Sequence, residues 1–163
     1  MPDDARAVLV APDSFKGTFR SSEVAAALGR GLESVVAAAP DLMPVADGGE
    51  GTLEVLLLAL GGETVGAEAS DALLLPIKAG FGLVEDGSTA IVETAQAIGL
   101  PQIEESERDA EAASSFGAGQ LIAAAAQSGA SRVVVAVGGS ASSDGGAGAL
   151  EAIEQAGGIG EAE

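Results

Sequence analysis

The first third of the chain alternates between short apolar runs and stretches with helical periodicity. The run AVLVA is continuous and apolar, which predicts a buried strand of a parallel sheet. Within residues 22–38, apolar residues recur at spacings of four and three, which predicts an amphipathic helix. We therefore expect a strand, a helix, a strand and a helix in turn, at residues 7–11, 22–38, 42–45 and 52–60. This order is typical of a right-handed parallel α/β unit.

The pattern changes after Gly62. Strand-like segments separated by turn residues follow each other closely, with Glu85-Asp86-Gly87 as the clearest hairpin turn. The expected elements are strands at 63–69, 77–84, 89–94 and 132–137, and helices at 117–128 and from about Gly146. The change predicts a domain boundary near residue 62, with one α/β portion at 1–62 and a second, partial, mixed-sheet α/β domain at 63–163.

Composition limits how well such a fold can be packed. Apolar residues make up 47% of the 163 positions, which is enough for a core. Glycine occupies 24 positions, however, and the only aromatic residues are four phenylalanines. Small side chains bury little area, and burial stabilises by only about 25 cal/mol per Å². We therefore expect a thin core with marginal stability.

Charge and missing residue types exclude several functions. The formal net charge of −18 argues against binding to nucleic acid or to anionic membranes, since both need basic patches. Without cysteine or histidine there is no thiol nucleophile, no Ser-His-Asp triad and no zinc site of the usual kind. Acid–base chemistry must fall to Asp, Glu, Lys16 or Lys78, and a bound metal would be a hard cation such as Mg²⁺. No signal peptide or membrane span is recognisable, so a cytoplasmic protein is expected.

Three polar, glycine-bearing loops each follow an expected strand and precede an expected helix. Ligands of open α/β sheets bind at this edge, where the strands end. In the first loop, Asp13, Ser14 and Lys16 precede the expected helix, with Arg20 next to its start. Basic side chains beside the free N–H groups of a helix start can bind an anion. A solvated turn explains this loop, taken alone, equally well.

The other two loops suggest a metal and an oxyanion. Asp47 and Glu50 lie among glycines, and two carboxylates on such a loop can hold Mg²⁺ beside phosphates. In the third loop, Gly138, Gly139 and Ser140 allow backbone amides to approach an oxyanion closely. Neither standard nucleotide-binding fingerprint is present. Taken alone, the second loop is more commonly a plain turn with acids facing water, and the third is weak evidence because glycine-rich turns are common.

In combination, five stretches of the chain resemble the signature stretches of type I glycerate kinases. In order they are APDSFKG at 11–17, PVADGGEGT at 44–52, the segment 93–101 (ETAQAIGLP), SFGAGQLI at 115–122 and GGSASSDGGAG at 138–148. The resemblance covers essentially the whole chain, and five collinear matches are highly specific. Ser142-Ser143 departs from the pattern, because the family usually has Thr-Asn there.

The resemblance implies ATP- and Mg²⁺-dependent phosphorylation of D-glycerate to phosphoglycerate, with D-glycerate and ATP as the small-molecule partners. It also implies two α/β domains, one flavodoxin-like and built from both ends of the chain, the other inserted between them. Family members are more than twice as long as this chain. We therefore expect an N-terminal fragment in which both domains are incomplete.

The same resemblance suggests roles for the loop residues, since phosphoryl transfer is mainly positioning and charge neutralisation. Lys16 would offset the charge of a phosphate or of the glycerate carboxylate, while Asp13 and Ser14 orient the substrate. Asp144 is the first choice for the base that accepts the hydroxyl proton, with Asp47 or Asp13 as alternatives.

The remaining roles concern the metal and the anionic groups. Asp47 and Glu50 would hold Mg²⁺ directly or through water. Binding of the anionic groups would fall to a set of basic and amide donors, namely Arg20, Gly138, Gly139 and Ser140.

Two other functional classes fit the same sequence. One is a non-catalytic α/β module that binds phosphate or an organic acid through the loops. The other is a truncated polypeptide without activity of its own.

Overall fold

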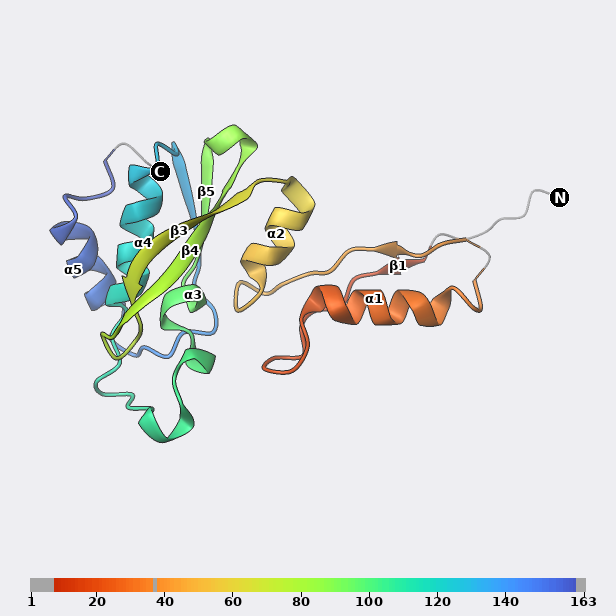
Figure 1. The fold of residues 1–163 in the computed structure, drawn as a ribbon, viewed down its shortest axis with the longest axis horizontal. Helices are drawn as coiled ribbons and strands as arrows, with labels where there is room; N and C mark the ends of the chain where they lie inside the picture. The colour runs from red at the N-terminus through yellow and green to blue at the C-terminus, as the bar shows by residue number, and fades with distance from the viewer. Residues whose placement is uncertain (1–7, 37, 161–163) are drawn as a thin grey trace. The chain divides into compact units, whose positions relative to one another are not determined.

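A computed structural model describes residues 8–36 and 38–160 (Figure 1). Its contacts divide the chain into two compact units, Met1–Asp47 and Gly48–Glu163. The first holds a two-stranded parallel sheet and the second a four-stranded mixed sheet. The expected α/β class, with a parallel sheet and a second mixed sheet, is therefore confirmed.

The first unit is a strand–helix–strand element. Strand β1 (Leu9–Val10) pairs in parallel with β2 (Asp41–Leu42), and helix α1 (Ser21–Leu32) connects them. The strands are shorter than expected, but backbone hydrogen bonding continues to the bond from the Val45 N–H to the Pro12 carbonyl. Ala7 of the expected first strand and Ala37 of the expected helix lie outside the described residues.

Helix α1 begins where the sequence predicts and ends earlier, at Leu32 rather than near residue 38. The Arg20 N–H at its start donates to the Glu23 carboxylate at 2.8 Å, so an acidic side chain supplies the missing acceptor of the first turn. Val24 and Ala25 form part of its buried face.

The sheet of the second unit has the order β3-β4-β5-β6. Its strands are β3 (Glu63–Ser70), β4 (Pro76–Val84), β5 (Thr89–Glu93) and β6 (Arg132–Ala136). The first two pairings are antiparallel, and β5 with β6 is parallel. A short 3-10 turn, Glu85–Gly87, joins β4 to β5, which confirms the expected hairpin.

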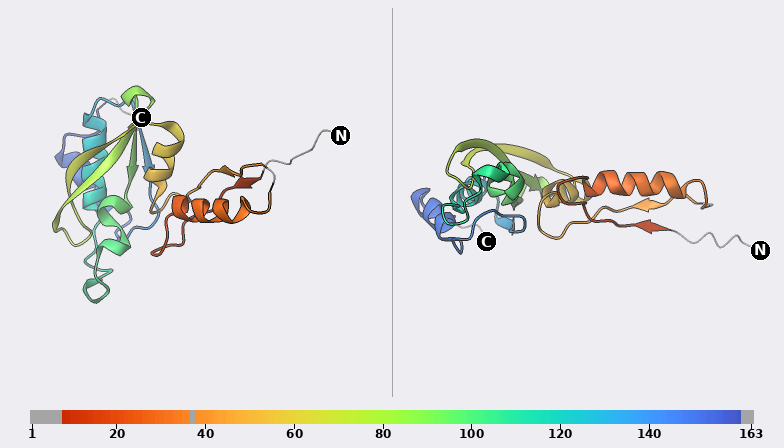
Figure 2. Two further views of the ribbon diagram at one scale, coloured as in Figure 1. Left: turned by 45° about the vertical axis from the view of Figure 1, so that its right-hand side comes forward. Right: turned by 90° about the horizontal axis from the view of Figure 1, so that it is seen from below.

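Helices cover both faces of this sheet (Figures 1 and 2). Helix α2 (Thr52–Leu60) packs Leu53 against Val84 and Ile91, while α4 (Phe116–Gln127) packs Leu121 into a cluster with Val92. Because Ile91 and Val92 are neighbours in a strand, they point to opposite faces. Helix α5 (Ala147–Gln155) packs on α4, and the short α3 (Ala95–Ile98) follows β5. The 3-10 turns Leu100–Gln102 and Glu105–Glu107 follow α3.

Helix α2 corrects one expectation from the sequence pattern. It was expected to complete a strand–helix–strand–helix unit with the first two strands, whereas its apolar side packs on β4 and β5. Those strands offer a larger apolar surface than the two-residue strands β1 and β2. The division of the contacts falls after Asp47. A domain boundary near residue 62 stays a prediction.

The core of the second unit consists largely of small side chains. Its main cluster contains several alanines around Phe81, Ile98 and Leu121, as the composition predicts. None of the described helices is long and apolar enough to cross a membrane.

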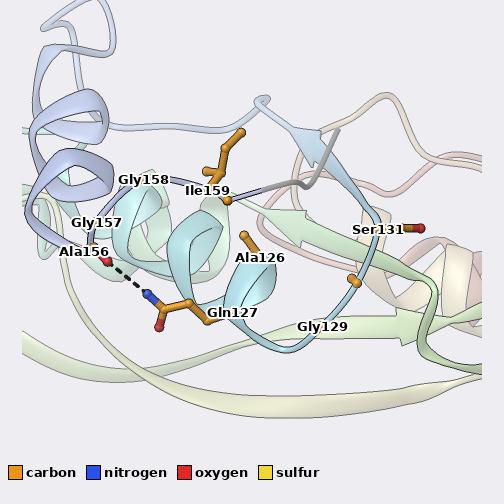
Figure 3. A pocket seen from close by; sticks show the side chains of 10 residues that line it. Ala126, Gln127, Gly129, Ser131, Ala156, Gly157, Gly158 and Ile159 are labelled. Atoms are coloured by element: carbon orange, nitrogen blue, oxygen red, sulfur yellow. Dashed lines mark hydrogen bonds between the residues drawn. The ribbon is translucent and has the colours of Figure 1, made fainter.

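A hollow of about 500 Å³ lies between the end of α4 and the segment after α5 (Figure 3). It is lined by residues 126–127, 129–131 and 156–160, and the Gln127 side-chain amide donates to the Ala156 carbonyl at 3.2 Å. None of the predicted site residues lines it.

Candidate functional site

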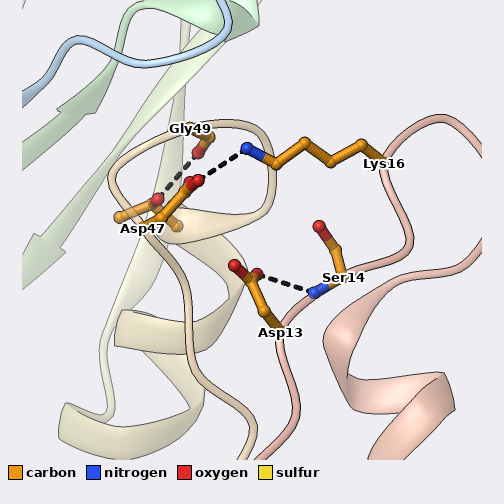
Figure 4. Close-up of polar contacts among 6 residues, drawn as sticks. Asp13, Ser14, Lys16, Asp47 and Gly49 are labelled. Carbon is orange, nitrogen blue, oxygen red and sulfur yellow. Dashed lines mark hydrogen bonds and ion pairs between the residues drawn. The ribbon is translucent and has the colours of Figure 1, made fainter.

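The first two predicted loops supply one polar cluster in the first unit, consisting of Asp13, Ser14, Lys16 and Asp47 (Figure 4). Because β1 and β2 are parallel, the loops that follow them begin at the same edge of the sheet. Asp13 follows Pro12 directly, and Asp47 lies two residues after Val45, the partner of Pro12 in the last backbone hydrogen bond. The Lys16 ammonium then spans the two loops and donates to the Asp47 carboxylate, with 2.6 Å between Nζ and Oδ2.

This ion pair is open to solvent. The side chains of Lys16 and Asp47 are 71% and 49% exposed. The hydrogen bond to Asp47 and the charge of Asp47 raise the pKa of Lys16, with a smaller contribution from the charge of Asp13. Lys16 is therefore a cation at neutral pH. Because exposed ion pairs are weak, an incoming anion can compete with Asp47 for it.

The rest of the first loop is held by local contacts. The Ser14 N–H donates to the Asp13 carboxylate at 2.6 Å, and both residues are half-buried. Arg20 lies at the start of α1, four residues after Lys16. The structure thus brings Asp13, Lys16 and Asp47 together as one group.

In the second unit, the second and third loops meet at the end of β6. The Gly138 N–H donates to the Gly48 carbonyl at 2.8 Å. A Cβ atom at residue 138 would lie 2.7 Å from the Gly49 Cα and 2.9 Å from the Gly48 carbonyl carbon. Contacts this short do not occur for real side chains, so the two loops can meet only with glycine at residue 138.

This contact bears on the predicted oxyanion site. The Gly138 N–H is used inside the chain, so Gly139 and Ser140 are the amides that stay predicted to bind an anion. The Leu100 N–H donates to the Gly139 carbonyl at 3.0 Å, which fixes this loop against the segment after α3. The hydroxyl oxygens of Ser140 and Ser142 lie 2.9 Å apart.

Asp144 is the centre of a hydrogen-bond network. Its Oδ2 accepts from the N–H and the hydroxyl of Ser115, both at 2.8 Å, and from the Gly148 N–H at 3.1 Å. Its Oδ1 accepts from the Gly146 N–H at 3.0 Å. Burial raises the pKa of Asp144, but these hydrogen bonds outweigh it and lower the pKa to about 2.

The network ties the start of α5 to the residues before α4. A carboxylate with a pKa near 2 and occupied lone pairs is a weak proton acceptor at neutral pH. The geometry of Asp144 is therefore that of a residue that organises a loop. Its role as the catalytic base stays a prediction.

The predicted Mg²⁺ ligands are the carboxylates of Asp47 and Glu50 in the second loop. Glu50 is exposed, and Asp47 shares a carboxylate oxygen with Lys16. No group of three acidic residues suited to a metal cage occurs among residues 8–36 and 38–160. Mg²⁺ is usually held by one or two carboxylates together with waters and substrate phosphates. The exposed Glu50 carboxylate suits that manner of binding, and joint binding of Mg²⁺ by Asp47 and Glu50 stays a prediction.

Sequence reasoning missed two residues in this region. Glu93 is fully buried and accepts hydrogen bonds from Gly51 and from Leu53 of α2, and Ser115 donates to Asp144. The signal for Glu93 was an acidic residue at the end of an apolar strand, without a cation near it in the sequence. Ser115 begins the signature stretch 115–122, but nothing in the sequence indicates its contact with Asp144, which lies 29 positions away.

We expect Asp144→Ala to lower the free energy of unfolding by about 2 kcal/mol at neutral pH, because hydrogen bonds to a charged acceptor are lost. The difference from wild type should shrink as the pH falls from about 4 towards 2. The folded-state pKa lies below the unfolded value, so the carboxylate stabilises the fold above the unfolded pKa and loses this effect on protonation. Denaturant titrations across this range measure both effects.

Asp109→Ala is the matched control, since this exposed carboxylate also accepts two backbone N–H bonds. It should cost less than about 1 kcal/mol. If Asp144→Ala lowers the free energy of unfolding by the same amount at every pH, the charge of Asp144 does not have the stabilising role assigned to it.

Known proteins match this chain over a region that includes the three loops. The sequence model of the glycerate kinase family matches residues 8–156. The glycerate kinase of Bacillus subtilis is 41% identical over 147 residues, which are 90% of this chain and 38% of that protein. The glycerate 2-kinase of Escherichia coli is 40% identical over 147 residues, which are 90% and 39% of the two chains.

A solved structure gives the same result. The crystal structure of a protein described as glycerate kinase 2, from Salmonella typhimurium LT2, matches with a TM-score of 0.73 and 38% identity. The match covers 92% of this chain and 40% of that chain. The chain thus spans well under half the length of the relatives that it matches. Since the family match includes all three loops, the chain belongs to the glycerate kinase family.

Proposed function

We propose that this chain is the N-terminal part of a cytoplasmic glycerate kinase, which transfers a phosphoryl group from ATP to D-glycerate with the help of Mg²⁺. One observation carries the proposal. Asp13, Lys16 and Asp47 meet where the strands of the first unit end, in a chain whose family match includes them. A cation flanked by carboxylates suits a reaction whose substrate and donor are both anionic.

Lys16 would bind an anionic group, either a phosphate of ATP or the carboxylate of D-glycerate. Its raised pKa keeps it charged, and its exposure leaves it accessible. In the first unit Arg20 would add an anion-binding donor, and in the second unit the amides of Gly139 and Ser140 would bind an anionic group. Ser14, held next to Asp13, would orient the substrate hydroxyl groups. Phosphoryl transfer depends mainly on such positioning and charge neutralisation.

Asp47 and Glu50 would hold Mg²⁺, directly or through water. Their carboxylate oxygens are the donors that this ion prefers. When bound, Mg²⁺ neutralises phosphate charge and orients the transferred group.

Asp13 is the proton acceptor that the contacts favour. Asp144 uses its oxygens for loop hydrogen bonds and has a pKa of about 2, while Asp47 shares an oxygen with Lys16. Asp13 uses Oδ1 for the Ser14 N–H. Its place beside Lys16 would put it near a substrate held by that cation.

The full-length enzyme should release ADP from ATP only when D-glycerate and Mg²⁺ are both present. A coupled assay of ADP formation measures this, with L-glycerate and EDTA as controls. Binding of D-glycerate or ATP in calorimetry without any turnover would instead support a non-catalytic binding module. A folded enzyme with neither binding nor turnover would contradict both functions.

Lys16→Ala should lower kcat/KM by at least about 100-fold, because a cation at a phosphoryl-transfer site supports the transition state. Lys78→Ala is the matched control. Lys78 is an exposed residue of β4 opposite Glu68, outside the three loops, and its removal should change kcat/KM less than about twofold. Equal effects of the two substitutions would refute the assignment of Lys16.

Asp13→Asn should lower kcat by about 100-fold or more with little change in melting temperature, since general bases contribute that much. Asp144→Asn should lower the melting temperature, because it disturbs the network around Ser115. Kinetics and thermal unfolding of both variants separate the roles. If Asp144→Asn keeps the wild-type melting temperature and loses more kcat than Asp13→Asn, Asp144 is the base.

A further inference from the structure

Glu93 is a charged side chain in the interior that the proposed chemistry does not use. It is the last residue of β5 and is 0% exposed, as buried as Phe81 and Leu121 of the core. A carboxylate removed from water is costly unless hydrogen bonds replace the lost solvation. The hydrogen-bond donors around Glu93 therefore indicate which part of the chain it holds in place.

Three donors surround the Glu93 carboxylate. Oε2 accepts from the Leu53 N–H at 2.8 Å, and Oε1 accepts from the Gly51 N–H at 3.2 Å. The Gln96 side-chain amide donates to Oε1 at 3.1 Å. Gly51 and Leu53 flank the first residue of α2, where backbone N–H groups have no acceptor within the helix. Glu93 thus holds the start of α2 from 40 and 42 positions away.

The same contacts fix the loop that carries Glu50. At one end of the loop, the Gly48 carbonyl accepts from the Gly138 N–H at 2.8 Å. At the other end, Gly51 donates to Glu93. Glu50 lies between these two points with its side chain exposed. The backbone on both sides of Glu50 is therefore held by groups of the sheet edge.

We propose that Glu93 is a positioning residue, which acts through Gly51 to hold the Glu50 carboxylate for Mg²⁺ bound with ATP. This proposal rests on the proposed function. A glutamine at residue 93 has the same shape but only one acceptor oxygen. Because Gly51 and Leu53 donate to different oxygens, one of them would then face an amide NH₂ instead of an acceptor.

The test compares wild type, Glu93→Gln and Asp71→Ala in the full-length enzyme, with Mg²⁺ titrated at saturating ATP and D-glycerate. Glu93→Gln should raise the Mg²⁺ concentration for half-maximal rate at least about fivefold and lower kcat about tenfold, because a misplaced ligand weakens metal-assisted transfer. The KM for D-glycerate should change less than about twofold, since Glu50 has no role in binding it.

Asp71→Ala is the structural control. Asp71 is also a buried carboxylate, and it accepts the Leu73 and Leu75 N–H bonds in the turn between β3 and β4. It should lower the melting temperature at least as much as Glu93→Gln while the Mg²⁺ dependence stays as in wild type. Wild-type Mg²⁺ dependence in Glu93→Gln, or an equal shift in Asp71→Ala, would overturn the proposal.

A second measurement separates this proposal from the proposed function. If the wild-type enzyme does not phosphorylate D-glycerate, the proposed function fails, and with it the role of Glu93 towards Mg²⁺. Amide hydrogen exchange in the 163-residue chain then tests the contact itself. Glu93→Gln should speed exchange at Gly51 or Leu53 at least about tenfold while the buried amides of α4 keep their rates. Unchanged exchange at both amides would overturn the positioning contact as well.

Discussion

Backbone N–H groups at the start of a helix need acceptors from outside the helix, and in this chain carboxylates supply them. Glu93 accepts from Leu53, the second residue of α2, and Asp144 accepts from Gly148, the second residue of α5. At α1 the acceptor comes from the helix itself, because the Glu23 carboxylate accepts from the Arg20 N–H at the helix start. A negative charge at this end of a helix also interacts favourably with the helix dipole. The loops that hold the candidate chemistry are ordered by these contacts.

The composition explains why the partners of these carboxylates are backbone amides rather than cationic side chains. The chain has 25 acidic residues and only seven basic ones, so most carboxylates cannot form an ion pair. Backbone N–H groups take the place of the missing cations at Asp13, Asp71 and Asp109 as well. Such hydrogen bonds are stronger than those between neutral groups. Against this background, the ion pair between Lys16 and Asp47 uses one of the few basic residues at a place that the sequence predicts to be functional.

The sequence predicted the local elements better than their assembly. Hydrophobic periodicity and turn residues placed α2 and the hairpin at residues 85–87 correctly, because these signals are local. The partner of α2 could not be predicted this way, since packing on β4 and β5 depends on contacts distant in sequence. Likewise, Lys16 and Asp47 were both candidates, but only the parallel pairing of β1 with β2 brings them together. The contacts of Glu93 and Ser115 could not be predicted, because their partners lie 29 to 42 positions away.

The residues before α2 and α5 show a further kind of selectivity. Gly51 and Gly146 both adopt left-handed backbone conformations, with φ of 91° and 86°, and neither has an atom within 4 Å of where a Cβ would lie. Space is therefore available at both positions, and only the handedness of natural amino acids excludes other residues. L-alanine is strained there although its methyl group has room, whereas the backbone preference of a D-alanine matches this conformation. At Gly138, by contrast, the Gly49 backbone leaves no room for an L side chain. Chemical synthesis with D-residues could thus separate glycines kept for chirality from glycines kept for size.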